Sequence, residues 1–287
     1  MTMNAADFDY VRQLLIRRSG ISLVAGKEYL VESRLAAVAQ KLKLPSAVEV
    51  IAQLRRTNAG PIVDAVIEAM TTNETSFFRD VYPFEMLRDV VIPERLKVGA
   101  PGRPIHIWCG ASSTGQEPYT IAIVLRESFG VEAANRFRIV ATDISLDVLE
   151  RAKEGVYSQF EVNRGLSPQQ LARHFEQVGS SFRVRPEVKK MIEFKPVNLV
   201  EAWPDFPTLD IVFLRNVLIY FEDQTKRVIL SRINKLLAPR GFLFLGGAET
   251  TMGLSEGFER RQLEKAVVYQ RQPTQFTRRI HAPPPAR

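Results

Sequence analysis

From about residue 105 onward, short apolar runs alternate with amphipathic stretches, and this alternation constrains the fold more than any other feature of the chain. Apolar runs of about four to eight residues predict strands, and apolar residues spaced three and four apart predict helices. Strands that alternate with helices are typical of a parallel-rich sheet with helices on both faces. We therefore expect an α/β domain with strands at 105–109, 136–145, 209–216, 241–247 and 266–271, and helices at 116–130, 145–155 and 222–239.

Residues 1–70 follow a different pattern, with four short stretches of helical periodicity. Ser46 precedes one stretch in the position of a helix cap, and Pro61 opens the next at a favoured first helical position. This part of the chain is therefore predicted to be a small all-α domain, with helices near 8–20, 27–42, 46–56 and 61–70.

Three more segments complete the expected organisation. A polar linker and a helix follow the all-α domain, and a long insertion at 155–208 separates the second and third strand–helix units. The insertion contains a helix and two β-like runs, FRVR and KMIEF. The C-terminus is rich in proline and basic residues, a composition typical of disorder. The expected boundaries are 1–70 for the helical domain, 71–95 for the linker and its helix, 96–272 for the α/β domain with a β-rich insertion at about 176–196, and 273–287 for the tail.

Composition excludes several classes of protein. One cysteine and three histidines, scattered far apart, rule out an internal disulfide and argue against a metal site. No apolar run approaches the roughly 18 residues that would span a membrane. The N-terminus is acidic and polar, unlike a secretory signal. We expect a cytoplasmic protein without a metal and without membrane insertion.

The net charge of +7 and the pI near 9.6 favour an acidic partner, either a nucleic acid or an acidic protein surface. Part of this charge lies in the helical domain. Residues 1–60 contain nine Lys or Arg against five Asp or Glu, a difference of +4.

A turn of small residues, WCGASSTGQEPY at 108–119, joins the first expected strand to its helix. Small residues let the backbone approach a ligand closely, with the helix N-terminus aimed at it. The spacing matches neither dinucleotide-binding nor phosphate-binding loops. Glu117, in a turn without Lys or Arg, suits a ligand with positive charge, such as a sulfonium with its α-amino group. A purely structural tight turn is the alternative.

Asp143 ends the second expected strand. A carboxylate in this position of a nucleoside-binding sheet accepts hydrogen bonds from both ribose hydroxyls. The alternative is a cap for the next helix, although Ser145 is already placed for that role. Ribose binding is therefore the favoured interpretation.

Polar residues also follow the third strand, in VFLRNVLIYF at 212–221. Arg215 and Asn216 lie at the carboxyl edge of that strand, where open α/β sheets bind ligands. The hydroxyl of Tyr220 can reach such a site while its ring forms a wall. Upstream, Asn198 could bond an adenine amine, although alone it is indistinguishable from a turn residue.

Five stretches of this chain resemble the chemotaxis receptor glutamate methyltransferases, the CheR family. They are TTNETSFFRD, WCGASSTGQEPYTIAI, ATDIS, the Asn-Leu pair at 198–199 and LRNVLIYF, in the family's order and spacing. The resemblance covers about residues 8–270. It implies an all-α domain followed by a doubly wound, Rossmann-like methyltransferase sheet that carries a small antiparallel β-subdomain. It also implies S-adenosylmethionine (SAM) as methyl donor, S-adenosylhomocysteine as product, and glutamate side chains of chemoreceptors as the methylated groups.

The resemblance implies a role for each matching residue. Arg79 and Tyr220 would shape the methyl-transfer site, and Arg79 would also face the cofactor. The other cofactor contacts would come from Asn73 and Thr75 in the linker, Glu117 at the methionine end, Asp143 at the ribose, Asn198 and Leu199 around the adenine, and Arg215 and Asn216 beside the reactive end.

Two departures from the family's pattern bear on function. The glycine-rich turn carries Gln116 where the family has a first glutamate, but Glu117 keeps the contacting position. The link EQVGSS at 176–181 is shorter than the loop of members that dock on a receptor's C-terminal pentapeptide. We therefore expect pentapeptide-independent binding. The partner would be the acidic methylation region of a chemoreceptor, bound through the basic N-terminal helices, with no nucleic acid, and the enzyme would be a monomer.

Two other functions stay open from the sequence. The basic pI suggests a nucleic-acid methyltransferase, but the chain lacks the prolines that build an amine-binding turn after the fourth strand of such enzymes. A non-catalytic SAM-binding adaptor is the second alternative. The complete set Arg79, Glu117, Asp143 and Tyr220 argues against it.

Overall fold

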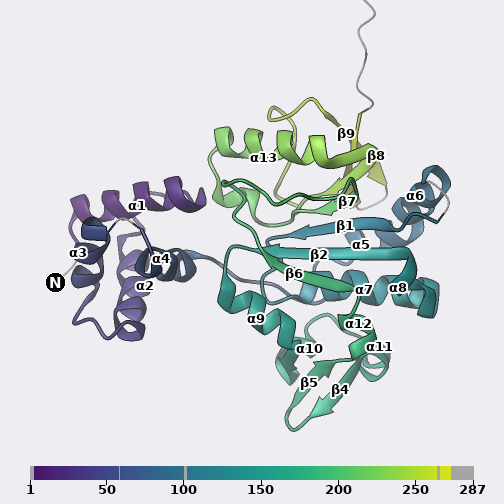
Figure 1. The fold of residues 1–287 in the computed structure, drawn as a ribbon, viewed down its shortest axis with the longest axis horizontal. Coiled ribbons are helices and arrows are strands. Elements are labelled where there is room, and N and C mark those ends of the chain that lie inside the picture. Colours follow the sequence, from purple (N-terminus) through teal and green to yellow (C-terminus); the bar gives the residue numbers. More distant parts are fainter. Residues whose placement is uncertain (1–2, 58, 100–101, 264–265, 273–287) are drawn as a thin grey trace, which may run out of the picture.

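The computed structural model describes residues 3–57, 59–99, 102–263 and 266–272 (Figure 1). Four helices lie at one end of the molecule, and a twisted sheet with its helices forms the rest. The tail at 273–287, predicted to be disordered, lies outside the described residues.

The N-terminal helices match the prediction from the sequence. Asn4 caps the first helix by accepting the N–H of Asp7, and Gly20 ends it at φ +74, a left-handed conformation that glycine adopts without a steric penalty. Buried side chains from Phe8 to Met70 form a core of their own. The four helices are α1 (Ala5–Ser19), α2 (Glu28–Lys41), α3 (Ala47–Thr57) and α4 (Pro61–Met70).

Seven strands form one sheet in the order β6-β2-β1-β7-β8-β10-β9. Its first five strands are parallel, whereas β10 pairs antiparallel with both β8 and β9. This confirms the doubly wound α/β fold. The strands are β1 (Ile105–Gly110), β2 (Phe137–Asp143), β6 (Ile192–Pro196), β7 (Leu209–Phe213), β8 (Leu237–Phe244), β9 (Phe258–Leu263) and β10 (Ala266–Arg271).

Helices cover both faces of the sheet because its central strands are apolar on both sides. In β1, Ile107 and Cys109 pack with the buried side of α7, while Trp108 points to the other face and packs with α13. The linker is followed by one helical run in three parts, α5 (Tyr82–Met86), a π-helical turn (Leu87–Val91) and α6 (Ile92–Val98). The other helices are α7 (Gln116–Phe129), α8 (Ala133–Arg136), α9 (Leu146–Glu154), α10 (Gln159–Asn163), α11 (Pro168–His174), α12 (Pro186–Lys189), α13 (Asp223–Leu236) and the 3₁₀ turns Gly130–Glu132 and Leu218–Tyr220.

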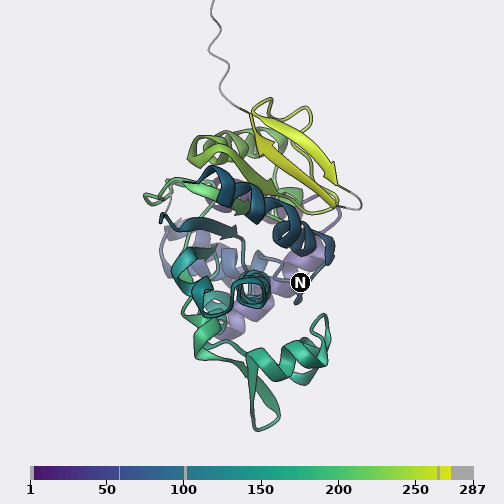
Figure 2. The same cartoon turned by 90° about the vertical axis from the view of Figure 1, so that its right-hand side faces the viewer.

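The insertion forms a separate three-stranded antiparallel sheet in the order β3-β5-β4. It projects from the large sheet on the side opposite to β9 and β10 (Figure 2). The short hairpin between its second and third strands leaves only residues 179–180 as the turn. Its strands are β3 (Val156–Ser158), β4 (Phe175–Val178) and β5 (Ser181–Val184).

One expectation about this insertion was wrong, because the run KMIEF does not belong to the small sheet. It becomes β6 and pairs parallel with β2, with Ile192 opposite Ile139. A short β-like run has the same local pattern in either sheet, so only the partner strand distinguishes the two outcomes. The small sheet takes its third strand instead from Val156–Ser158, upstream of the expected range of about 176–196.

Candidate functional site

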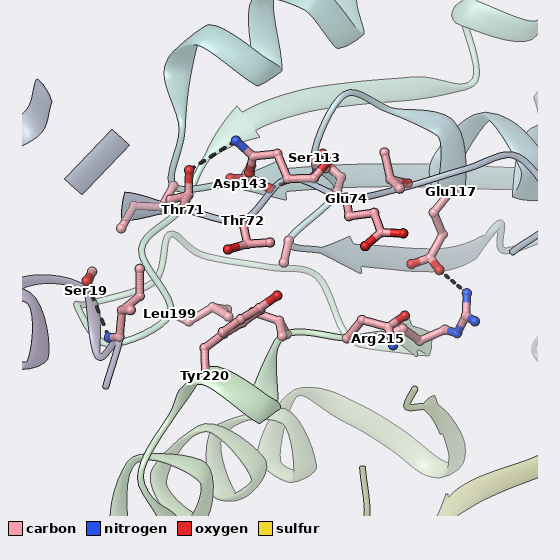
Figure 3. Close-up of a pocket in the computed structure, with 18 of the residues that line it drawn as sticks. Ser19, Thr71, Thr72, Glu74, Ser113, Glu117, Asp143, Leu199, Arg215 and Tyr220 are labelled. Atoms are coloured by element: carbon pink, nitrogen blue, oxygen red, sulfur yellow. Dashed lines mark hydrogen bonds and ion pairs between the residues drawn. The ribbon is translucent and has the colours of Figure 1, made fainter. Parts of the chain in front are cut away.

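A cavity opens at the carboxyl ends of β1, β2 and β7, the edge where open α/β sheets bind ligands (Figure 3). It holds about 970 Å³, including space open to solvent. All ten residues singled out from the sequence line it: Asn73, Thr75, Arg79, Glu117, Asp143, Asn198, Leu199, Arg215, Asn216 and Tyr220.

The linker segment Thr71–Ser76 forms one wall of this cavity. Phe77, directly after it, is 1% exposed and meets Tyr157 and Phe175 of the small sheet edge-on, at 5.0 and 5.5 Å between ring centroids. Phe78 turns the other way and packs against Phe84 at 5.8 Å. The two aromatic side chains therefore fix the linker from opposite sides, and the polar residues before them stay at the cavity.

The glycine-rich turn after β1 needs an unusual backbone. Gly115 has φ +94, and a Cβ there would lie 2.9 Å from Cβ of Ala152, so only glycine fits without displacement. Ala111 and Ser113 also take positive φ values, +53 and +49. This path aims the N–H of Ser113 at the carboxylate of Asp143, at 2.8 Å.

Asp143 is 6% exposed at the end of β2. Its carboxylate accepts the N–H of Ser113 and, at 3.0 Å, the N–H of Ser145. Burial raises the pKa of this carboxyl, and the backbone hydrogen bonds oppose that increase. Ser145 caps α9 with its own side chain, as the sequence suggested, so Asp143 is not needed as the cap. Two N–H donors occupy only part of the acceptor capacity of a carboxylate.

Glu117 and Arg215 form an ion pair at the inner end of the cavity (Figure 3). The guanidinium of Arg215 also donates to Asp80 at 2.6 Å and to the backbone oxygen of Arg79 at 3.1 Å. Burial lowers the pKa of Arg215, but Glu117 and Asp80 more than offset this effect, so the net pKa is raised and the charge is kept. Cys109 donates its thiol to the other oxygen of Glu117 at 3.3 Å.

Arg79 and Tyr220 bring free polar groups to the cavity. One guanidinium N–H of Arg79 donates to the backbone oxygen of Glu74 at 2.9 Å, and the guanidinium forms no ion pair with any described residue. The carboxylate of Glu74 pairs instead with Arg164 of the insertion at 3.0 Å. The hydroxyl of Tyr220 points into the cavity (Figure 3) and has no hydrogen-bond partner among the described residues.

The helical domain supplies a wall of the cavity that sequence reasoning missed. Ser19 and Ile21, at the end of α1, line the cavity. In the next residue, the N–H of Ser22 donates to the backbone oxygen of Tyr220 at 2.9 Å. Asn198 donates its side-chain amide to the backbone oxygen of Arg18 at 2.6 Å. Nothing in the local sequence of α1 signals these contacts, because their partners lie roughly 180 to 200 residues away.

Two sequence profiles match this chain almost end to end. The profile of the CheR methyltransferase all-alpha domain matches residues 6–71, and that of the CheR methyltransferase SAM-binding domain matches residues 73–267. The chain belongs to the CheR methyltransferase family. It is a SAM-dependent methyltransferase of the chemotaxis type, and the boundary between the two profiles falls at the start of the linker.

Similar CheR-family proteins come from several bacteria. Chemotaxis protein methyltransferase Cher2 of Pseudomonas putida is 38% identical over 94% of this chain and 99% of its own length. Chemotaxis protein methyltransferase 1 of Pseudomonas aeruginosa is 39% identical over the same shares. The chemotaxis protein methyltransferase of Vibrio parahaemolyticus is 38% identical over 94% of this chain and 98% of its own.

The polar side chains of the cavity fit SAM, the cofactor of this CheR-family enzyme. It offers a buried carboxylate with spare acceptor capacity at Asp143, a second carboxylate at Glu117 and an unpaired guanidinium at Arg79. Among the described residues, no cluster of His, Cys, Asp and Glu could hold a metal ion. The same part of the chain contains no helix long and apolar enough to cross a membrane.

Proposed function

We propose that this enzyme transfers the methyl group of SAM to glutamate side chains on chemoreceptor helices, giving glutamate methyl esters and S-adenosylhomocysteine. The observation that carries this proposal is that the described residues lining the cavity include no His, Lys or Cys and no carboxylate without a partner. Glu74 pairs with Arg164, Glu117 pairs with Arg215, and Asp143 accepts backbone N–H groups.

A carboxylate nucleophile does not need a base. A glutamate side chain has an ordinary pKa of about 4.3, so it is ionised at neutral pH. An amine or hydroxyl nucleophile must first lose a proton. The reaction is then an in-line displacement, in which a carboxylate oxygen forms a bond to the methyl carbon as the bond to sulfur breaks. Opposite charges disappear in this step, so orientation and exclusion of water supply most of the catalysis.

The cavity residues divide naturally between cofactor and substrate under this proposal. Asp143 would bind the ribose hydroxyls. Glu117 would bind the α-amino group of SAM, while Arg215 holds the carboxylate of Glu117 in place. Leu199 would contact the adenine. Arg79 and Tyr220, with their unpaired guanidinium and hydroxyl, would orient the incoming glutamate. The free donors on these two side chains support this assignment.

Further cavity residues would complete the cofactor site. Asn73 and Thr75 would contact SAM from the linker wall, and Asn216 would lie beside its reactive end. Asn198 donates its side-chain amide to the backbone oxygen of Arg18, and its side-chain oxygen accepts the N–H of Val200 at 3.2 Å. We propose that Asn198 holds the adenine wall in place instead of bonding an adenine amine.

The receptor would bind across the helical domain. Several of its basic side chains are already paired: Arg12 with Asp9, Arg55 with Asp7, Arg56 with Glu49, and Lys41 with Asp147. Lys27 is exposed and forms no ion pair with a described residue, and it lies in the loop that continues from the cavity wall at Ile21. Exposed Val24 and Tyr29 flank it. Such a patch suits an acidic amphipathic helix with glutamates on its surface.

Charge reversal tests this docking site. We expect Lys27→Glu to raise KM for receptor membranes about three- to tenfold with kcat unchanged, because one exposed contact to an acidic surface is lost. The matched control is Arg56→Glu on α3, whose partner is within its own domain. Equal effects of both variants would contradict a localised docking patch.

One assay tests the proposed reaction itself. Purified enzyme is incubated with methyl-labelled SAM and either receptor-containing membranes or nucleic acid. We expect label on the receptor band that is released as methanol by mild base, since carboxyl methyl esters are base-labile. Base-stable label, or label on nucleic acid, would refute the proposal. SAM binding without transfer to either acceptor would indicate an adaptor.

We further propose that the enzyme acts in the cytoplasm as a monomer and binds receptors without their C-terminal pentapeptide. The two-residue turn between β4 and β5 leaves no long loop beside the edge of the small sheet, which supports pentapeptide independence. Calorimetry with the isolated receptor pentapeptide should show no binding. Micromolar affinity for that peptide would overturn this part.

A further inference from the structure

Glu249 lies outside the cavity, in the turn that follows β8, and is 9% exposed. No sequence feature marks it, and it is not among the residues that line the cavity. Its carboxylate nevertheless accepts five hydrogen bonds, all of them from backbone N–H groups. Oε2 accepts the N–H groups of Asn216 at 2.8 Å and Gly246 at 2.6 Å, and Oε1 accepts those of Val217 at 2.8 Å, Leu218 at 2.7 Å and Ile219 at 3.4 Å.

The N–H groups of 216–219 belong to the turn that presents catalytic candidates to the cavity. Asn216, Val217 and Tyr220 all line it. The turn leaves β7 and enters the 3₁₀ turn Leu218–Tyr220, whose first N–H groups have no partner within the turn itself. Glu249 supplies the missing acceptor, and a buried N–H left without one destabilises the fold.

The backbone at Asn216 shows why this acceptor matters. Asn216 has φ +59, a left-handed conformation that residues with a side chain seldom adopt, asparagine more often than most. Carboxylate bonds to its own N–H and to the next two N–H groups hold this conformation. The facing turn is packed closely as well, since a Cβ on Gly246 would lie 2.6 Å from Nδ2 of Asn216.

We propose that Glu249 is a positioning residue for methyl transfer, because its carboxylate fixes the turn that sets Asn216 and Tyr220 against the reactants. It acts through the backbone and touches neither cofactor nor substrate. The effect on turnover rests on the proposed function, whereas the effect on the turn's path does not depend on what is methylated.

Glu249→Gln is the decisive variant. The amide has the same shape, but its NH₂ group must face backbone N–H donors where an oxygen accepted them, so the turn has to move. We expect kcat to fall about 10- to 100-fold, because misplacing an orienting group by roughly 1 Å has effects of that size. SAM affinity should fall far less, since Asp143 and Glu117 lie on other strands and helices.

The matched control is Asp210→Asn, at the opposite end of β7. Asp210 is 1% exposed and accepts from Arg95 at 2.5 Å, from Arg103 at 2.7 Å and from the N–H of His106 at 3.0 Å. The variant Asp210→Asn therefore shows how much stability is lost when a buried, fully hydrogen-bonded carboxylate is replaced away from the turn at 216–220. At a temperature where both variants are folded, equal kcat values would overturn the proposal.

Two measurements keep the proposal testable if Glu249→Gln folds poorly or the substrate is wrongly assigned. Gly246→Ala places a Cβ 2.6 Å from Nδ2 of Asn216 and 2.8 Å from Oε2 of Glu249, so it disturbs the same contact from the facing turn and should reproduce the loss of kcat. A crystal structure of whichever variant folds should show Asn216 out of the left-handed region and Tyr220 displaced. An unchanged path for 216–220 would overturn the proposal even if receptor methylation itself had failed.

Discussion

Replacing Arg79 with alanine tests most directly how the cavity orients its substrate. Truncation removes the guanidinium but not the backbone oxygen of Arg79, which accepts from Arg215 at 3.1 Å. The buried network of Arg215, Glu117 and Asp80 should therefore remain. The only other hydrogen bond of Arg79 within the described protein joins its guanidinium to the backbone oxygen of Glu74. This contact is exposed and contributes little to stability.

The expected magnitude follows from the donors that Arg79 keeps free. A guanidinium has five N–H donors, and the structure engages one of them, which leaves a fork for a carboxylate. Two hydrogen bonds to a charged group are worth about 3–6 kcal/mol when fully buried. Arg79 is only partly buried, so we expect less than this, about 2–3 kcal/mol. That range corresponds to a loss of roughly 30- to 150-fold in kcat.

The assay is steady-state transfer of labelled methyl groups to receptor membranes, with SAM affinity measured separately by calorimetry. Arg164→Ala is the control, because it removes the partner of Glu74 on the outer side of the linker without removing a cation from the cavity. It should stay within about threefold of the wild-type enzyme. If Arg79→Ala keeps turnover within a few-fold, or loses SAM affinity as much as kcat, its orienting role is wrong.

Three further outcomes are expected. Asp143→Asn should weaken binding of S-adenosylhomocysteine about 10- to 100-fold in calorimetry, through lost ribose hydrogen bonds, whereas exposed Asp147→Asn should not change it. Gly115→Ala should lower the free energy of unfolding by about 1–3 kcal/mol in denaturant titrations, because it strains the turn at φ +94; an unchanged midpoint would contradict this. Burial raises the pKa of Glu68, so its carboxyl should make stability fall as pH rises from the ordinary glutamate pKa to the raised one. Glu68→Gln should flatten that part of the stability–pH profile, and an unchanged slope would refute the assignment.

Local rules explain which parts of the site could be predicted from the sequence. Asp143 ends a strand and Glu117 opens a helix, and both positions follow from periodicity and from the fact that parallel strands end at one edge. The five motifs in order then identified the family. Arg215 was also placed correctly at this edge, but its burial and its pairing with two carboxylates depend on α7 and the linker, which the strand pattern does not describe.

Residues whose partners lie far along the chain could not be predicted in this way. Glu249 follows two glycines and an alanine, which is typical of a turn, yet its partners lie about 30 residues upstream. Ile21 is similar, since it forms a bridge with Phe221 that no periodicity signals. The strand β6 was misassigned for the same reason. In each case the local pattern is correct, and the missing information is which distant segment the residue meets.

The contacts between the two domains suggest that cofactor and receptor binding are linked. Glu68 of α4 accepts from the side chain of Ser145 and, at 3.2 Å, from the N–H of Leu146, two and three residues after Asp143. Lys41 of α2 pairs with Asp147 one residue further on, at 2.9 Å. A ligand held by Asp143 therefore sits against a helix N-terminus that the helical domain itself completes.

Because Ser19 and Ile21 also line the cavity, SAM in this site would contact both domains at once. A ligand that binds only the docked arrangement stabilises it by mass action, by about 2.7 kcal/mol at a hundredfold excess over Kd. A receptor that binds the helical domain and also inserts its glutamate into the cavity selects the same docked arrangement. The two ligands should then favour each other's binding, and this coupling must be equal in both directions because it is a property of binding free energies.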